Sequence, residues 1–335
     1  MKDAYARAGV DIAAKNRSNK LLGEVASRTF SPDVVGGAGF FGGMYEFKGY
    51  QKPVLVSSTD SVGTKTKIAI ALERYDTVGR DIVNHCVNDI FTSGAAPIFF
   101  LDYIGIGKLV PEKVASIVEG LAQACADVDC VLIGGETAEL TDVYSGEDYD
   151  LAGFIVGVVE RNNIIDGSSI AAGDALIGLP SNGLHTNGYT LARKIFGDTK
   201  EALQKRYPSL ERPIGEALLE PHLCYYNQLK PLLPLVRGMA HITGGGLIDN
   251  VPRVLPDGLA ARFDSKAWKV PPLFTLMQEL GDVDRDEMYH VFNMGIGMVV
   301  VCAPEDVREL TAQLPGSRVI GEVVEQSDES RAFID

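Results

Sequence analysis

Val54-Leu-Val-Ser-Ser-Thr-Asp60-Ser-Val-Gly63-Thr64-Lys65-Thr-Lys67 is the stretch of sequence that decides the fold. An apolar β-rich run ends at Asp60, and Gly63-Thr64-Lys65 opens a predicted helix. This order places a carboxylate, free backbone N–H groups and an ammonium group at one strand end, a layout typical of a site for a metal-bound polyphosphate. The spacing of a Walker loop is absent. The alternative is an ordinary Asp cap beside a solvated lysine.

The strand and helix pattern continues on both sides of this stretch. In the first half we predict strands at 54–60, 97–106, 130–137 and 149–160, and helices at 64–74, 77–93 and 111–126. In the second half we predict strands near 175–180, 260–264, 294–302 and 317–325, and helices near 187–196, 213–219, 222–236, 246–254, 271–280 and 304–313. The polar stretch 161–173 is typical of a domain boundary. We therefore expect a mixed α/β (α+β) protein whose two domains meet at a cleft.

Composition narrows the function classes. The chain has 335 residues, 46% of them hydrophobic and 23% charged, which is typical of a globular protein with two cores. A formal charge of -14 disfavours nucleic acid as a partner, because phosphate binding needs clustered lysine and arginine. We find no apolar run long enough for a membrane span and no secretion signal at Met1-Lys-Asp-Ala, so we expect a cytoplasmic protein. The cysteines, five in number, have no zinc spacing and are expected to be buried thiols.

A glycine-rich segment, Val34–Gly43, contains Gly37-x-Gly39-x-x-Gly42, the spacing of a dinucleotide-binding turn. The residues before it have a turn composition and those after it are predicted to be extended, so the strand–turn–helix context of that motif is missing. We reject the dinucleotide interpretation. Two interpretations remain: a mobile flap that closes over the phosphates of a nucleotide, with Phe40 and Phe41 as apolar anchors, or a structural loop with no ligand.

Two further clusters carry oxygen ligands in the first half. In the predicted helix 77–93, Asn84 and Asn88 lie on one face and Asp89 follows, a set that suits Mg²⁺. Ile133-Gly-Gly-Glu136-Thr137 places a carboxylate at another predicted strand end. A solvated helix face and an ordinary cap are the alternatives for these two clusters.

The second half contains two polar turns before predicted helices. The first turn carries Asn182, His185, Thr186 and Asn187, which offer several hydrogen bonds to a phosphate or an amide. The second is His241-Ile-Thr243-Gly244-Gly-Gly246. A single histidine is more often a structural residue than a catalyst, but two in such turns favour function.

Together these motifs resemble those of one enzyme family over nearly the whole chain. The matching segments are Tyr5–Ile12, Thr59–Lys65, Val87–Asp89, Phe99–Tyr103, Gly134–Glu139, Gly146–Asp150, Ser181–Tyr189, His241–Gly246 and Glu287–Met298. They are similar to the motifs of phosphoribosylformylglycinamidine cyclo-ligase, also called aminoimidazole ribonucleotide synthetase.

The resemblance implies an ATP-dependent ring closure in purine biosynthesis. ATP activates the formamide oxygen of formylglycinamidine ribonucleotide, a nitrogen of the amidine side attacks that carbon, and ADP and phosphate leave as 5-aminoimidazole ribonucleotide forms. It also implies an N-terminal domain (1–165) that binds ATP and Mg²⁺ and forms a dimeric barrel-like core from mixed sheets. The C-terminal α/β domain (166–335) would lie on the substrate side, in a homodimer.

The resemblance assigns roles to individual residues. Asp60 and Asp89 are the expected metal ligands, with Asn88 as a helper, and Lys65, His241 and both aspartates are the expected catalytic residues. The residues expected to hold ATP are Gly37, Gly39, Gly42, Gly63, Thr64, Lys65, Glu136 and Thr137. The residues expected to contact the ribonucleotide substrate are Asn182, His185, Thr186, Asn187, His241, Thr243 and Gly244. His241 is expected to stabilise charge or to move a proton at the amidine.

The sequence departs from the family pattern at two places. Ser61 stands where glycine is common, and Leu140–Tyr144 replaces a Pro-Gly pair after Glu139, which changes the expected shape of that loop.

Rival interpretations are weaker. Selenophosphate synthetase would need a reactive cysteine or selenocysteine near its N-terminus, and the hydrogenase-maturation dehydratase would need one at its C-terminus; neither is present in this sequence. Thiamine-monophosphate kinase is another ATP-using relative with the same fold. A non-catalytic nucleotide-binding protein is the alternative from another class, which the intact Asp60, Lys65, Asp89 and His241 disfavour.

Overall fold

The first half of the chain forms a four-stranded sheet with the order β3-β6-β4-β5, in a computed structural model that describes residues 12–37, 41–327 and 329–335. Its strands are β3 (Pro53–Ser61), β4 (Ala96–Ile106), β5 (Val131–Glu139) and β6 (Tyr149–Glu160). β4 pairs with β5 in parallel, and β6 is antiparallel to both β3 and β4. The carboxyl ends of β3, β4 and β5 therefore lie at the same end of the sheet.

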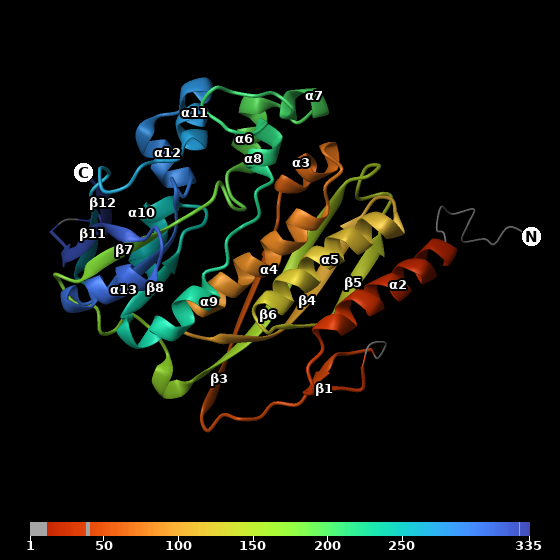
Figure 1. The fold of residues 1–335 in the computed structure, drawn as a ribbon, viewed down its shortest axis with the longest axis horizontal. Helices are drawn as coiled ribbons and strands as arrows, with labels where there is room; N and C mark the ends of the chain where they lie inside the picture. Colours follow the sequence, from red (N-terminus) through yellow and green to blue (C-terminus); the bar gives the residue numbers. More distant parts are fainter. Residues whose placement is uncertain (1–11, 38–40, 328) are drawn as a thin grey trace, which may run out of the picture.

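Helices cover one face of this sheet (Figure 1). The helices of this half are α2 (Ile12–Ala26), α3 (Lys65–Ala71), α4 (Asp76–Phe91) and α5 (Pro111–Asp127). The helices α4 and α5 approach closely because each has a glycine at the contact; a Cβ atom on Gly79 would lie 2.1 Å from the Ile117 carbonyl oxygen. The helix α2 packs beside α5 at the β5 edge, where the backbone N–H of Leu132 donates to Thr29 Oγ1 at 2.9 Å.

The opposite face of the sheet is open. Side chains of β3 alternate strictly between half-buried and exposed, as expected for a strand with one covered face. Two large apolar side chains lie on the open face, Leu55 with 64% and Phe154 with 45% of their surface exposed. Before β3, a short hairpin of β1 (Val34–Val35) and β2 (Met44–Tyr45) flanks the glycine-rich segment.

The second half forms a six-stranded sheet with the order β12-β9-β11-β7-β10-β8. Its strands are β7 (Ala175–Pro180), β8 (Gly238–His241), β9 (Leu259–Phe263), β10 (Ile296–Cys302), β11 (Arg318–Glu325) and β12 (Ala332–Ile334). Its helices are α6 (Tyr189–Phe196), α7 (Lys200–Leu203), α8 (Ile214–Leu218), α9 (Tyr226–Leu229), α10 (Gly246–Asn250), α11 (Pro272–Gly281), α12 (Arg285–Val291) and α13 (Val307–Gln313). Every residue of β10 is buried, which explains its uninterrupted apolar sequence.

Two departures from the predicted elements of the second half bear on the site. The predicted helix 222–236 is only the short α9 followed by a 3₁₀ helix (Lys230–Leu235), because Pro231 and Pro234 remove backbone donors. The strand β8 was not predicted at all, although it ends at His241 and so positions a candidate site residue.

The two halves meet along the polar face of α4. Side chains of α4 form hydrogen bonds with backbone groups of the segment Glu220–Tyr225 in the second half. Asp81 Oδ1 accepts from the His222 N–H at 2.7 Å, and Asn84 Nδ2 donates to the His222 carbonyl at 2.7 Å. Asn88 Oδ1 accepts from the Tyr225 N–H at 2.9 Å. The polar helix face that the sequence showed is therefore buried between the halves.

Candidate functional site

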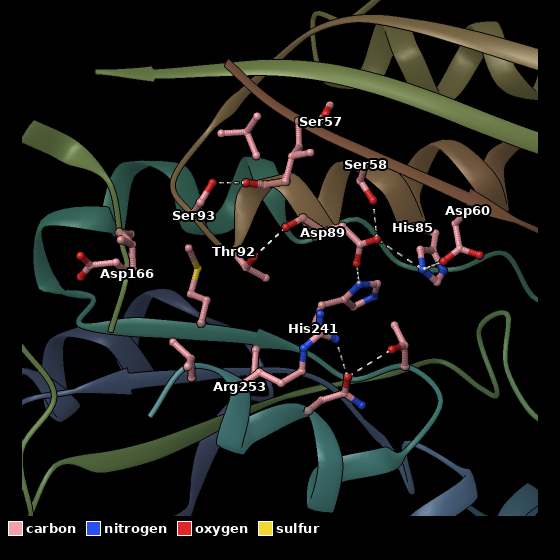
Figure 2. Close-up of a pocket in the computed structure, with 18 residues that line it drawn as sticks. Ser57, Ser58, Asp60, His85, Asp89, Thr92, Ser93, Asp166, His241 and Arg253 are labelled. Atoms are coloured by element: carbon pink, nitrogen blue, oxygen red, sulfur yellow. Dashed lines mark hydrogen bonds and ion pairs between the residues drawn. The ribbon is translucent and has the colours of Figure 1, made fainter. Parts of the chain in front are cut away.

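A cavity of about 520 Å³, which we call the central cavity, lies between the two halves. β3 and α4 form one wall, and β8 with the residues that follow it forms the other (Figure 2). Asp60, Asp89, His241 and Thr243 line it, as does Arg253. Asp60, Asp89, His241 and Thr243, which the sequence analysis placed in three separate segments, are thus brought together.

The two carboxylates converge on one imidazole. Asp60 Oδ2 lies 3.0 Å and Asp89 Oδ2 lies 3.6 Å from Nε2 of His85. Burial acts to lower the pKa of His85, but the two carboxylates outweigh it and raise that pKa above its ordinary value. Burial acts to raise the pKa of Asp60 and of Asp89, but His85 holds the pKa of Asp60 below its ordinary value, and His241 together with His85 does the same for Asp89. Both carboxylates are therefore ionised at neutral pH.

Asp89 is also fixed by the second half. His241 Nδ1 lies 2.8 Å from Asp89 Oδ1, and the Ser58 hydroxyl donates to Asp89 Oδ2 at 3.0 Å. The other nitrogen of His241, Nε2, lies 2.9 Å from Nε2 of His222. Both nitrogens of His241 are thus engaged, and in this arrangement the ring orients Asp89.

His222 is a residue of the site that the sequence did not reveal. Its Nδ1 lies 3.4 Å from Thr186 Oγ1, which in turn lies 2.7 Å from His85 Nδ1. A closed chain of hydrogen bonds therefore links His222, Thr186 and His85 to the carboxylates. His222 belongs to a segment predicted as helix, where nothing about a single histidine indicates this contact.

His185 does not line the central cavity, and its expected contact with the substrate stays a prediction. Its backbone has a φ of 63° and its ring is 1% exposed, stacked on His222 with 4.0 Å between ring centroids. Burial lowers the pKa of His185 well below its ordinary value. The ring is a neutral core group in this arrangement.

Lys65 does not line the central cavity either. Its Nζ is completely buried, 2.9 and 2.8 Å from the two carboxyl oxygens of Asp81, and donates to the carbonyls of His185 and Glu220. In this arrangement the ammonium group meets protein acceptors only, and the expected contact with the ATP phosphates stays a prediction. Lys65 ties α3 to α4 and to the second half.

Asn88, the expected helper in metal binding, contacts the backbone of the second half in this arrangement. Its Oδ1 accepts from the Tyr225 N–H, its Nδ2 donates to the Leu223 carbonyl at 2.8 Å, and the residue has no exposed surface. Its amide is consumed in holding the second half.

The remaining predicted residues lie around the site. Gly63, with a φ of 66°, and Thr64 lie at the start of α3, where the Thr64 hydroxyl is 3.3 Å from that of Thr190. Asn182 donates to the Pro221 carbonyl at 2.8 Å and lines a separate cavity of about 550 Å³. Gly244 lies beside Asn187, whose Oδ1 would be 3.3 Å from an added Cβ atom.

The predicted nucleotide residues of β5 line another cavity. This edge cavity, of about 980 Å³, lies between α2, the segment Phe41–Gly43 and the carboxyl end of β5. Gly42, Glu136 and Thr137 line it, whereas Gly37 does not. Gly39 and Phe40 lie outside the described residues, and Phe41 is fully exposed, so the structure does not show the predicted anchoring. Because β3 and β5 are opposite edges of the sheet, one chain does not bring Glu136 next to Asp60.

Arg253 is a second residue that the sequence did not single out. It follows α10 in a 3₁₀ helix (Val251–Arg253), and Figure 2 shows it on the side of the central cavity opposite Ser57 and Ser58. In the sequence, the position of this arginine after a glycine-rich turn was the one feature that could have indicated it. Its place at the cavity depends on the path of the chain through α10.

Comparison with known proteins places the chain in the class of two-domain AIR synthase related proteins. The model of the AIR synthase related protein N-terminal domain matches residues 44–159, and that of the C-terminal domain matches residues 171–333. Among solved structures, the hydrogenase maturation protein HypE in complex with ATP has a TM-score of 0.68 at 15% identity, covering 95% of this chain and 90% of that one. Thiamine-monophosphate kinase from Stenotrophomonas maltophilia has a TM-score of 0.66 at 16% identity, covering 97% and 96%. At these identities the likeness shows the fold.

Similarity to curated proteins identifies the family more narrowly. Phosphoribosylformylglycinamidine cyclo-ligase of Desulfitobacterium hafniense is 52% identical over 333 residues, 97% of this chain and 98% of the relative. That of Geobacillus kaustophilus is 49% identical over 332 residues, 96% of each. The chain belongs to the phosphoribosylformylglycinamidine cyclo-ligase family, the ATP-dependent ring-closing enzymes of purine biosynthesis. The family, fold and activity expected from the motifs are confirmed. Among the described residues, the structure contains no helix of the length and apolarity that crossing a membrane requires.

Proposed function

We propose that the central cavity is where this chain converts formylglycinamidine ribonucleotide to 5-aminoimidazole ribonucleotide with ATP. The observation that supports this most strongly is the convergence of Asp60 and Asp89, ionised and held by histidines, at the junction of the two halves. Phosphoryl transfer depends on positioning and on charge stabilisation, and two fixed carboxylates beside an open cavity provide both.

We propose Asp60 and Asp89 as the residues that hold Mg²⁺. Two carboxylates facing a polar cavity fit this ion, which takes its other oxygen ligands from water and substrate phosphates. Ligand atoms of His85, Asp89 and His241 also lie within 4.8 Å of one another, but the two imidazoles already contact the carboxylates, and imidazole suits other metals. When bound, Mg²⁺ neutralises the charge of the phosphate oxygens.

We assign the binding of the ribonucleotide substrate to residues of the second half. Arg253 offers a guanidinium group to the ribose phosphate, for which a bidentate geometry is favourable. His241 holds Asp89 through Nδ1 and lies close enough to the cavity to stabilise charge as the ring closes. The Thr243 hydroxyl borders the same space.

We further propose that the working form is a homodimer joined through the open face of the four-stranded sheet. Leu55 and Phe154 leave apolar surface exposed there. An exposed sheet face with large apolar side chains is typical of an interface. This pairing would produce the barrel-like dimer core implied by the family.

The dimer would also bring the central cavity of one chain close to the edge cavity of its partner. If the two-fold axis runs along the strands, the order of strands is reversed in the partner, and the β5 edge of one chain lies opposite the β3 edge of the other. The nucleotide residues Glu136 and Thr137 of one chain would then serve the Asp60 and Asp89 pair of its partner. Each active site would be composite.

Subunit complementation tests the composite site. A heterodimer of one Asp89→Asn chain and one Glu136→Ala/Thr137→Ala chain, purified through two different tags, contains one intact composite site. It is expected to regain about half of the wild-type rate of ring closure, although both parent homodimers are inactive. An inactive heterodimer would contradict the composite site, and a fully active Glu136→Ala/Thr137→Ala homodimer would contradict the nucleotide role of those residues.

Two finer points complete the proposal. We place the domain boundary at residues 165 and 166, in the connection between β6 and β7. We propose that the enzyme works in the cytoplasm, because its five cysteines are all unpaired thiols, as a reducing compartment favours.

A further inference from the structure

Two imidazole rings and a carboxylate converge at the wall of the central cavity. Ligand atoms of His85, Asp89 and His241 lie within 4.8 Å of one another, and Figure 2 shows both rings directed at the carboxylate. All three side chains line the cavity, so an ion can reach them from it. Two imidazole nitrogens with a carboxylate are a common ligand set for zinc and other transition-metal ions, whereas Mg²⁺ prefers oxygen ligands.

Asn88 determines the direction of the hydrogen bonds around His222. Oδ1 of Asn88 accepts from the Tyr225 N–H at 2.9 Å and Nδ2 donates to the Leu223 carbonyl at 2.8 Å, so two backbone groups fix the orientation of the amide. The same Nδ2 lies 3.3 Å from Nε2 of His222. Because an amide NH₂ group donates and does not accept, Nε2 of His222 is an acceptor.

The tautomer of His241 follows from this acceptor. Nε2 of His241 lies 2.9 Å from Nε2 of His222, and because the latter accepts, Nε2 of His241 carries the hydrogen. In a neutral ring the other nitrogen, Nδ1, then has a lone pair and no hydrogen. Nδ1 lies 2.8 Å from Oδ1 of Asp89, which is ionised. Two lone pairs therefore face each other at hydrogen-bond distance, and a cation between them removes this conflict.

His85 has a similar arrangement on the other side of Asp89. Its Nδ1 lies 2.7 Å from Thr186 Oγ1, and its Nε2 lies 3.6 Å from Asp89 Oδ2. Metal-binding histidines typically donate through one nitrogen to a protein acceptor and bind the ion through the other. Each ring has such an acceptor on the side away from Asp89: Thr186 beside His85, and His222 beside His241.

We propose that His85 Nε2, His241 Nδ1 and the Asp89 carboxylate bind one transition-metal ion of the Zn²⁺ type, whose remaining ligand position opens to the central cavity. Ligand atoms around a tetrahedral zinc ion lie about 3.3 Å apart, given bonds of about 2.0 Å, so the three side chains need only to contract around the ion. The Ser58 hydroxyl, which donates to Asp89 at 3.0 Å, orients the carboxylate. Binding releases to solvent the protons that the two nitrogens otherwise share with the carboxylates.

Zinc at this site excludes Mg²⁺ from Asp89. This consequence rests on the proposed function, in which Asp60 and Asp89 hold Mg²⁺. Because two imidazole nitrogens favour zinc over Mg²⁺, zinc is expected to inhibit ring closure by taking the carboxylate. The histidines therefore make the site sensitive to a second class of metal ion.

Zinc binding by the purified full chain, without a histidine tag, tests the assignment. Competition with a chromophoric chelator measures both the affinity and the number of ions, and the wild-type protein is expected to bind one zinc ion per chain. His85→Gln and His241→Gln each remove a nitrogen ligand and are expected to weaken binding by about 100-fold or more. Loss of a group that only orients a ligand already costs about 10-fold to 100-fold.

A matched control and a positioning variant make the result specific. His290→Gln removes an exposed histidine that pairs with Asp249 and is expected to keep the wild-type affinity. His222→Leu removes the acceptor beside His241 and is expected to weaken zinc binding by about 10-fold to 100-fold, whereas His222→Gln offers an oxygen acceptor and restores most of it. Circular dichroism checks the fold of each variant, and His85→Leu replaces His85→Gln if the latter does not fold.

The outcomes separate the inference from the proposed function. A wild-type protein that binds no zinc, or His85→Gln and His241→Gln variants that keep the wild-type affinity, would overturn the zinc site, while ring closure with Mg²⁺ in zinc-free buffer would still support the proposed function. One zinc ion per chain with an affinity that millimolar Mg²⁺ does not lower would contradict the role of Asp89 in holding Mg²⁺ and leave the zinc site in place.

Discussion

Replacing Asp89 with asparagine is expected to lower the rate of ring closure by about a thousandfold or more. The substitution keeps the size of the side chain and removes the negative charge that faces the central cavity. That charge is held in place by Ser58 and His241, so its loss removes a preorganised electrostatic interaction instead of a flexible one. The measurement is kcat for aminoimidazole ribonucleotide formation at saturating ATP and substrate.

A matched control separates this effect from a general loss of charge. Asp142→Asn removes an exposed carboxylate of the same half and is expected to leave kcat unchanged. Circular dichroism should show the same secondary structure for both variants. An Asp89→Asn enzyme with wild-type turnover would rule out Asp89 as a metal ligand or a catalytic residue.

Replacing Lys65 with methionine is expected to lower the free energy of unfolding by about 3–5 kcal/mol. Lys65 and Asp81 form a buried ion pair. Burial lowers the pKa of Lys65 and raises that of Asp81, whereas the attraction between the two charges acts in the opposite direction on each pKa. Without the ammonium group, Asp81 is a buried charge with no counter-ion, and the carbonyls of His185 and Glu220 lose their donor. Urea denaturation followed by fluorescence measures the loss.

Two further variants make this result specific. Lys67→Met, in the same stretch, breaks a partly exposed ion pair with Asp148 and is expected to change stability by less than about 1 kcal/mol. The double variant Lys65→Met/Asp81→Asn removes the unpaired charge and keeps an acceptor for the His222 N–H, so it should be more stable than Lys65→Met alone. Equal stability of Lys65→Met and Lys67→Met would contradict the structural role of Lys65 and favour a role at the phosphates.

The sequence predicted the fold well where local patterns are strong. Short local patterns predict β3, β10 and α4: alternation in β3, an uninterrupted apolar run in β10 and helical periodicity in α4. The positions of these three elements were therefore predicted closely. The short strand β8 has no such pattern, because its sequence Gly-Met-Ala-His is stabilised by pairing with β10. Neighbours from distant parts of the chain decide such an element.

The site was predicted only in part for a similar reason. Asp60, Asp89 and His241 stand at strand or helix ends, and their residue types already indicate chemistry. Lys65 has the same appearance in the sequence, but its burial depends on where Asp81 and the Glu220 carbonyl lie in the folded chain. Residue type predicts what a group can do, whereas the packing of the two halves decides what it contacts.

The rate of ring closure by the purified wild-type protein tests the central claim most directly. With ATP, Mg²⁺ and formylglycinamidine ribonucleotide, we expect ADP, phosphate and 5-aminoimidazole ribonucleotide to form in equal amounts, and we expect chelation of Mg²⁺ to stop the reaction. Cleavage of ATP without formation of the imidazole, or no cleavage at all, would contradict the account.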